Sequence, residues 1–286
     1  MMINPIVRRE AKTSLRSFKM FIAIAVYTFL IYISGLAYVK GVISNGYTGL
    51  DISSLSFVYV LLIILQFGMT AVLIPALTAG AISGERERQT LDILLVTKMS
   101  TVSIILGKLA SSISLFILMM VATLPVFGIV FFFGGVSLIH LLTLEIYITV
   151  FAVMVGSIGI FFSTILKKTI PAMVVTYIVI GILCILPIVV VAIYELYTQR
   201  LYLSSVSGAS VYIINSINPA FSILNLIDNQ MGSQRIMGML FGYTDNVDMA
   251  LLFLQKYTYI INIFINLGIT ALFTFLSSKI LRKSRD

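Results

Sequence analysis

Six long apolar segments limit what this chain can fold into. They cover residues 20–39, 57–82, 109–133, 138–166, 170–194 and 257–281. A helix of about 20 apolar residues crosses the hydrocarbon core of a bilayer, where each backbone polar group must be satisfied within the helix. Only 10% of the 286 residues are charged, against about a quarter in soluble domains. The sequence therefore predicts an all-α integral membrane protein, with six transmembrane helices in a single domain over residues 1–286.

The distribution of Lys and Arg predicts how these spans are oriented. If the N-terminus is cytoplasmic, the outer segments hold only four of the 19 Lys and Arg residues, namely Lys40, Arg200, Arg235 and Lys256. Cytoplasmic loops carry the excess of these cations in membrane proteins. We therefore expect a multi-pass protein with both termini in the cytoplasm, and we interpret the net charge of +8 as a topology signal, not as a nucleic-acid-binding surface. The compact size and the lack of a targeting peptide fit the cytoplasmic membrane of a bacterium or archaeon.

The predicted extracellular segment, residues 195–256, contains a stretch at 208–227 that is apolar enough for a seventh span. Asn218 and Pro219 interrupt this stretch, and a kinked, lipid-exposed backbone would leave polar groups unsatisfied. A seventh span would also move the C-terminal cations outside, against the charge bias. We therefore expect two short helices, broken near Asn218 and Pro219, that form an outer re-entrant hairpin before span six. An ordinary extracellular loop is the alternative.

The N-terminal residues 4–19 have the pattern of a helix that lies on a membrane surface. Asn4 and Pro5 suit a helix start, as an N-cap followed by proline at the first helical position. At about 100° per residue, one face is apolar and a separate arc is cationic. The cationic arc consists of Arg8, Arg9, Lys12, Arg16 and Lys19. Such a helix fits the anionic inner leaflet of the bilayer.

Residues 84–98, which we call the docking segment, combine charge with a helical pattern. Residues 85–88 read Glu-Arg-Glu-Arg, and Leu91, Leu94 and Leu95 follow at helical spacing. The segment follows the second span and is therefore expected in the cytoplasm. A helix with an apolar ridge and flanking charges fits a groove on a partner protein, whereas a solvated loop helix would not need the leucines.

This segment resembles part of a known family. The matching run is Glu85-Arg86-Glu87-x-Gln89-Thr90-Leu91-Asp92-x-Leu94-Leu95-x-Thr97, followed by Gly107-Lys108-Leu109. It resembles the segment between the second and third spans of type-2 ATP-binding-cassette (ABC) export permeases, where it forms the coupling helix that sits in a cleft of the partner ATPase subunit. The resemblance extends to the interfacial helix, the six spans and the outer hairpin. One departure is Lys98 after Thr97, where family members often have proline. The implied ATPase-docking residues are Glu85, Arg86, Glu87, Arg88, Gln89, Thr90, Leu91, Asp92, Leu94 and Leu95.

The sequence contains no recognisable catalytic set. Gly107-Lys108 is followed by Leu109 where a P-loop needs Ser or Thr, and Val102 takes the place of its first glycine. The lone His140 cannot build a metal site. The resemblance therefore implies a transport subunit that is not an enzyme and holds no cofactor, with ATP and Mg²⁺ bound by the partner ATPase. It also implies a second permease chain, identical or related, because one six-span chain offers half of a translocation path.

By resemblance, the second and fifth spans line that path. Gly68, Pro75 and Gly80 in the second span and Pro187 in the fifth allow close packing or bends, and they are candidate path residues together with Glu145. Glu145 lies in the fourth span, where an ionised carboxylate is costly. Either it has a partner on another helix or it snorkels to the outer surface. We expect snorkelling; a role in binding a cation or a proton is the sharper alternative.

Two other functions stay open. A gradient-driven secondary transporter or channel would need no ATPase, but that class usually shows internal repeats with matching intramembrane charges, and we find no convincing repeat. A membrane scaffold that recruits a cytoplasmic protein would share the docking segment. No residue in the sequence selects a substrate.

Overall fold

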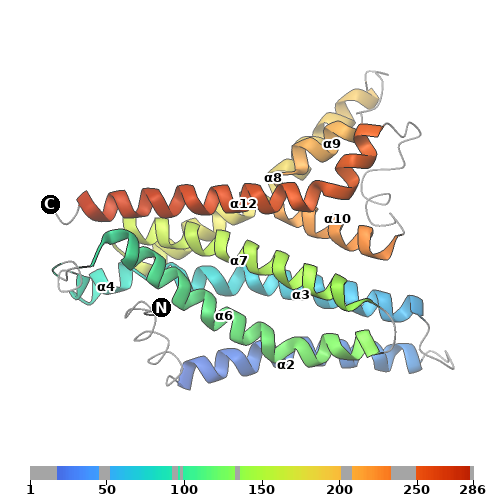
Figure 1. Cartoon of the computed structure of the whole chain (residues 1–286), viewed down its shortest axis with the longest axis horizontal. Helices are drawn as coiled ribbons and strands as arrows, with labels where there is room; N and C mark the ends of the chain where they lie inside the picture. Colours follow the sequence, from blue (N-terminus) through green and yellow to red (C-terminus); the bar gives the residue numbers. More distant parts are fainter. Residues whose placement is uncertain are drawn as a thin grey trace. The chain divides into compact units, whose positions relative to one another are not determined.

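The computed structural model describes residues 18–44, 52–91, 96, 99–132, 136–200, 208–232 and 249–283, and all regular secondary structure in these ranges is helical (Figure 1). This confirms the predicted all-α fold. The helices are α2 (Phe18–Ser44), α3 (Ile52–Thr78), α4 (Ser83–Glu87), α6 (Thr101–Phe132), α7 (Leu138–Ile165), α8 (Thr169–Arg200), α9 (Gly208–Asn215), α10 (Pro219–Met231) and α12 (Met249–Lys283).

Five helical stretches are long and apolar enough to cross a bilayer. They are Phe57–Glu87, Thr101–Gly128, Leu138–Ile165, Thr169–Tyr194 and Leu251–Lys283, and they correspond to the second through sixth predicted spans. The first predicted span lies in α2, where the apolar stretch among the described residues, Ile24–Leu36, is shorter. Length and composition therefore support five of the six predicted spans.

Several helices extend beyond the apolar segments that predicted them, and three of them extend the furthest. α6 begins at Thr101 and not at 109, α8 continues to Arg200 and not 194, and α12 begins at Met249 and not at 257. Hydropathy marks the part of a helix that lies in lipid. The i to i−4 hydrogen bonds of the backbone continue a helix further wherever its flanking residues allow it.

The chain divides into two compact units, and the first consists of Met1–Tyr177 with Thr270–Asp286. In this unit α3 packs against α2, α6 and α7, and α6 also packs against α2 and α7 (Figure 1). Aromatic side chains fill the space between these four helices. Those that are almost completely buried are Tyr27, Tyr59, Phe116, Phe127, Tyr147 and Phe151.

Two glycines let α7 approach its neighbours closely. A Cβ atom at Gly159 would overlap the hydroxyl of Thr78 on α3, and one at Gly156 would lie 2.9 Å from the Cδ1 atom of Leu109 on α6. Small residues are enriched at such helix interfaces because close backbone approach improves packing, which holds helices together where water does not. The contact of α7 with α3 and α6 therefore depends on these two glycines.

The second unit, Ile178–Ile269, contains the two short helices predicted on either side of Asn218 and Pro219. The Oδ1 atom of Asn218 accepts hydrogen bonds from two backbone N–H groups at the start of α10, at 2.8 and 3.2 Å, and Pro219 occupies the first turn. The Nδ2 atom of Asn218 donates to the carbonyl of Cys184 in α8 at 2.7 Å. The predicted helix break is confirmed, and one asparagine both starts α10 and fastens it to α8.

The predicted interfacial helix lies almost entirely outside the described residues, which begin at position 18. The side chains of Arg8, Arg9, Lys12, Arg16 and Lys19 are likewise outside the described part, so their role stays a prediction.

Candidate functional site

The docking segment begins as a helix and then turns. A turn at 79–82 leads from α3 into this segment, and the first residues of the segment belong to α4. α4 lies near the start of α6 (Figure 1). After α4, the N–H of Gln89 donates to the carbonyl of Arg86 at 3.1 Å, and the N–H of Thr90 donates to the carbonyl of Glu85 at 2.9 Å. Gln89 has a φ of 58°, the left-handed conformation that commonly ends a helix. α4 therefore ends at Glu87, and a turn interrupts the helix predicted over 84–98 before Leu91 and Val96, which are again helical.

Glu85 connects the docking segment to α6. Its Oε1 atom lies 3.3 Å from the Nζ atom of Lys108, and its Oε2 atom accepts a hydrogen bond from the hydroxyl of Thr90. The Lys108 side chain is 5% exposed and that of Glu85 is 35% exposed. A buried cation is strongly disfavoured unless an anion lies beside it, so the position of Glu85 is coupled to that of α6.

Arg86 connects the same segment to the end of α7. Its guanidinium donates to the carbonyl of Thr164 at 3.2 Å and to the carbonyl of Leu166 at 3.4 Å. The last carbonyls of a helix have no partner within the helix, and the negative end of the helix dipole favours a cation there. Arg86 therefore satisfies carbonyls that α7 leaves open at its C-terminus.

Glu87 connects the segment to the start of α8. Its Oε1 atom accepts a hydrogen bond from the backbone N–H of Thr169 at 3.0 Å, and its Oε2 atom lies 3.2 Å from the hydroxyl of Thr169. Thr169 is the first residue of α8, where the free N–H groups and the helix dipole favour an anion. Glu87 therefore acts as an N-terminal cap supplied from another part of the chain.

A buried serine of α7 fixes the backbone that leads into this segment. The Oγ atom of Ser163 accepts hydrogen bonds from the N–H groups of Ile82 and Ser83, both at 2.9 Å. Ser163 and Ser83 are both completely buried, and buried N–H groups need such acceptors. The start of α4 is therefore held against α7 independently of the charged side chains.

Glu85, Arg86 and Glu87 thus bind α6, α7 and α8 in turn, and we call this arrangement the three-helix contact. These charges were predicted to contact a partner protein, and in the structure each also has a partner within the chain. Arg88 and Gln89 are exposed, Val96 is 84% exposed, and Leu91 is 5% exposed. Asp92, Leu94 and Leu95 lie outside the described residues. The free surface of the described segment therefore begins at Arg88.

The candidate path residues of the second and fifth spans lie in different surroundings. Pro75 is buried inside α3, Pro187 is inside α8, and Gly80 lies in the turn after α3. Within the described chain, a Cβ atom at Gly68 would have no neighbour within 4 Å, and one at Gly80 would have a neighbour at an ordinary 3.7 Å. Neither glycine lies at a close helix contact within the described chain, and their role in the translocation path stays a prediction.

Glu145 has a partner on another helix, so the expected snorkelling to the outer surface is wrong. Its Oε2 atom accepts a hydrogen bond from the Nε2 atom of Gln66 on α3 at 3.0 Å. Gln66 is completely buried and Glu145 is 7% exposed. Snorkelling requires a polar end that reaches water, whereas here the amide of Gln66 binds one carboxylate oxygen inside the helix bundle. The other oxygen, Oε1, is buried and has no hydrogen-bond partner among the described residues.

Four residues that organise the site had no predicted role in it, although Lys108 is part of the run that resembles the ABC export permeases. Lys108, Ser163 and Thr169 hold the docking segment, and Gln66 holds Glu145. Gln66 was a usable signal, because an amide in the middle of an apolar span needs a polar partner. The other three lie near the ends of apolar segments, where polar residues are common and carry little information.

The family model described as "ABC-2 family transporter protein" matches residues 4–284. No curated protein matches the chain.

Proposed function

This chain belongs to the ABC-2 family of transporter proteins, and on that premise we propose that it is the permease subunit of an ATP-driven exporter. A separate ATPase subunit docks on the segment 84–98 and supplies the site for ATP and Mg²⁺. A second permease chain completes the translocation path. Work from ATP hydrolysis enters this chain through the docking segment.

The three-helix contact is the observation that supports this proposal. Three consecutive side chains of one short segment bind α6 at Lys108, the end of α7 at Leu166 and the start of α8 at Thr169. A displacement of α4 therefore changes contacts with three membrane helices at once. Movements of a few ångströms at such contacts are enough to switch a packed helix bundle between two arrangements.

The contact with the ATPase uses the part of the segment that is free in this chain. Arg88, Gln89 and Val96 are exposed, and the leucines at 94 and 95 continue the same stretch of sequence. The left-handed conformation of Gln89 redirects the chain after α4. One half of the segment thus binds the membrane helices and the other half binds the ATPase, as transmission of a force requires.

The orientation follows from the charge bias. Both termini and the docking segment are cytoplasmic, α9 and α10 form the outer hairpin, and the cationic N-terminal helix lies on the inner leaflet. The hairpin enters the outer leaflet and returns, which keeps an even number of crossings between the termini.

Co-purification tests the proposal. The tagged full-length chain is extracted from its host in mild detergent, beside the variant Arg88→Glu/Val96→Asp and the control Lys40→Glu. All three positions are exposed. In the proposed topology Lys40 lies on the outer side of the membrane, whereas Arg88 and Val96 lie on the cytoplasmic side. We expect a stoichiometric P-loop ATPase with the parent and the control, and its loss from the double variant.

Two outcomes contradict this reading in different ways. If a well-folded parent carries no ATPase, the exporter proposal fails, and a gradient-driven carrier becomes the better hypothesis. If the ATPase stays bound to the double variant, the exporter proposal survives but the docking surface is not the one beginning at Arg88.

A further inference from the structure

A cavity of about 660 Å³ lies between the start of α6 and the last turns of α12, within the first unit. It is partly open to the surroundings and lies outside the three-helix contact. The residues that line it come from only two short stretches of sequence. They are Ser100, Thr101, Val102, Phe275, Ser278, Lys279 and Arg282.

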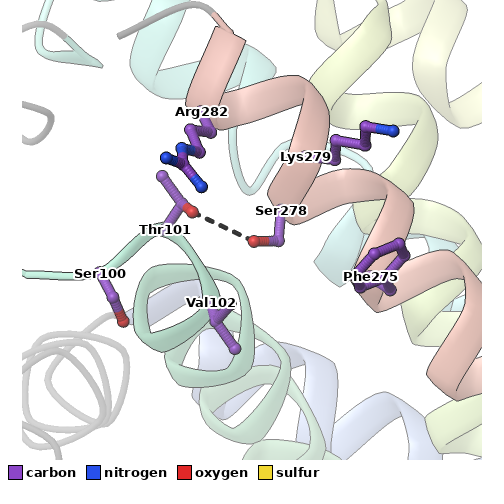
Figure 2. A pocket seen from close by; sticks show the side chains of 7 residues that line it. All are labelled: Ser100, Thr101, Val102, Phe275, Ser278, Lys279 and Arg282. Carbon is purple, nitrogen blue, oxygen red and sulfur yellow. Dashed lines mark hydrogen bonds between the residues drawn. The ribbon is translucent and has the colours of Figure 1, made fainter.

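A hydrogen bond between the two helices forms the base of this cavity. The hydroxyls of Thr101 and Ser278 lie 3.1 Å apart, and both residues are less than 10% exposed. Figure 2 shows these two side chains facing each other, with the guanidinium of Arg282 beside Thr101. The hydroxyl of Ser100 accepts a hydrogen bond from the N–H of Ser103 at 3.2 Å, which starts α6. The cavity is therefore built on a fixed contact and is not a gap between loose side chains.

The lining of the cavity is cationic. Lys279 and Arg282 are exposed, and neither forms an ion pair with a residue in the described part of the chain. Among the described residues, the lining includes no Asp or Glu. The N-terminus of α6, a helix of 32 residues, adds a positive dipole end at the same place. This chemistry favours an anion, and a phosphate group above all.

Two of the lining residues, Val102 and Phe275, are apolar. Val102 is 50% exposed and Phe275 is 68% exposed. Phe275 precedes Lys279 by about one turn of α12, so an apolar surface lies directly beside the cations along the helix axis. A soluble phosphate would use the cations alone, whereas a molecule with a phosphate and a hydrocarbon chain would use both surfaces.

We propose that this cavity binds the phosphate head group of an anionic phospholipid from the inner leaflet. Lys279 and Arg282 bind the phosphate, the hydroxyl of Ser100 donates to it, and the acyl chains lie along Val102 and Phe275. The proposal rests on the proposed orientation, which places this end of α6 and α12 at the cytoplasmic surface, where anionic lipids attract Lys and Arg. A lipid bound here would link the start of α6 to the end of α12.

Direct binding to the purified full-length chain tests the site. The probes are dioctanoyl phosphatidylglycerol, dioctanoyl phosphatidylcholine and glycerol 3-phosphate, and native mass spectrometry measures their affinities. We expect tight binding of phosphatidylglycerol and weak binding of the other two. The variant Lys279→Gln/Arg282→Gln should weaken phosphatidylglycerol binding about tenfold or more, since each cation near a membrane surface contributes about a fivefold factor.

The control is Lys283→Gln, which removes an exposed cation of the same helix end that does not line the cavity. It should change the affinity by less than about twofold, because a cation outside the cavity makes no direct contact with the phosphate. Phe275→Ser should weaken binding of phosphatidylglycerol but not of glycerol 3-phosphate. Circular dichroism checks that each variant keeps its helix content.

Three results would overturn the proposal. An equal loss with Lys283→Gln would mean general surface attraction, and glycerol 3-phosphate binding as tightly as phosphatidylglycerol would mean a soluble-anion site. Loss of the co-purifying ATPase in the Lys279→Gln/Arg282→Gln variant, with lipid binding unchanged, would mean a protein contact. The lipid measurement uses the isolated chain, so the lipid proposal can fail while the exporter proposal holds. Equally, the chain can bind the lipid even if no ATPase co-purifies with it.

Discussion

Replacing Gly159 with alanine tests the packing on which the helix bundle depends. The added methyl would overlap the hydroxyl of Thr78 and lie 3.1 Å from its Cβ atom and 3.5 Å from the backbone nitrogen of Ala79. The hydroxyl cannot rotate away freely, since it donates to the carbonyl of Ile74 at 2.8 Å. α3 and α7 must therefore separate by about 1 Å to reach an ordinary contact distance, or that hydrogen bond must break.

The expected cost follows from these two alternatives. Overpacking a core by one methyl costs about 1–3 kcal/mol, and loss of a hydrogen bond costs about 0.5–1.5 kcal/mol. Alanine is better than glycine inside a helix by about 0.5–1 kcal/mol, which offsets part of the cost. We expect a net destabilisation of about 1–2 kcal/mol, and a fall in melting temperature of at least about 2 °C.

The melting temperature is measured by circular dichroism in detergent, because the chain contains no Trp and its intrinsic fluorescence is weak. Gly181→Ala is the matched control: within the described chain, a Cβ atom there has no neighbour within 4 Å, so helix propensity alone should act and stability should hold or rise. Adding Thr78→Ala to Gly159→Ala removes the overlapping hydroxyl and should restore part of the loss. If Gly159→Ala melts at or above the parent temperature, the close contact between α7 and α3 is wrong.

Three further predictions concern the polar contacts and the topology. Glu145→Ala should destabilise the protein by about 1–3 kcal/mol, because it leaves the buried amide of Gln66 without its acceptor, whereas Glu145→Gln keeps an acceptor and should cost less; thermal melting compares the two variants. Asn218→Ala should cost about 1–2 kcal/mol through loss of the α10 cap, with Asn218→Asp between it and the parent in the same assay, since aspartate keeps the cap but not the donated hydrogen bond. In a background where the single native cysteine is serine, Lys40→Cys should react with an impermeant maleimide added to intact cells and Lys167→Cys only after permeabilisation; the reverse pattern would refute the proposed orientation.

The sequence predicts the features of this fold that depend on neighbouring residues. The break at Asn218 and Pro219 is an example, because capping and the geometry of proline are local effects. Five spans follow from hydropathy in the same way. The exact helix ends do not, because the residues that extend α6 back to Thr101 mix polar and apolar side chains with Gly107, and such a stretch could equally belong to a loop.

Features that depend on distant residues were beyond sequence reasoning. Gln66 and Glu145 are 79 positions apart, and Glu87 and Thr169 are 82 apart. When the residues of other helices are unknown, a carboxylate in a span is expected to snorkel to water, and charges in a loop are expected to contact another protein. Both expectations changed once packing brought polar groups from other helices alongside, and no local pattern encodes that pairing.

The three-helix contact has a consequence for chimeric permeases. An exchange of docking segments between two transporters is a natural way to redirect one to the ATPase of the other. Here Glu85, Arg86 and Glu87 depend on Lys108, the end of α7 and Thr169. A graft limited to 84–98 would place new charges opposite an unchanged Lys108, α7 end and Thr169. A compatible graft must therefore exchange these three contact sites as well, or it must keep residues 85–87 and begin at Arg88.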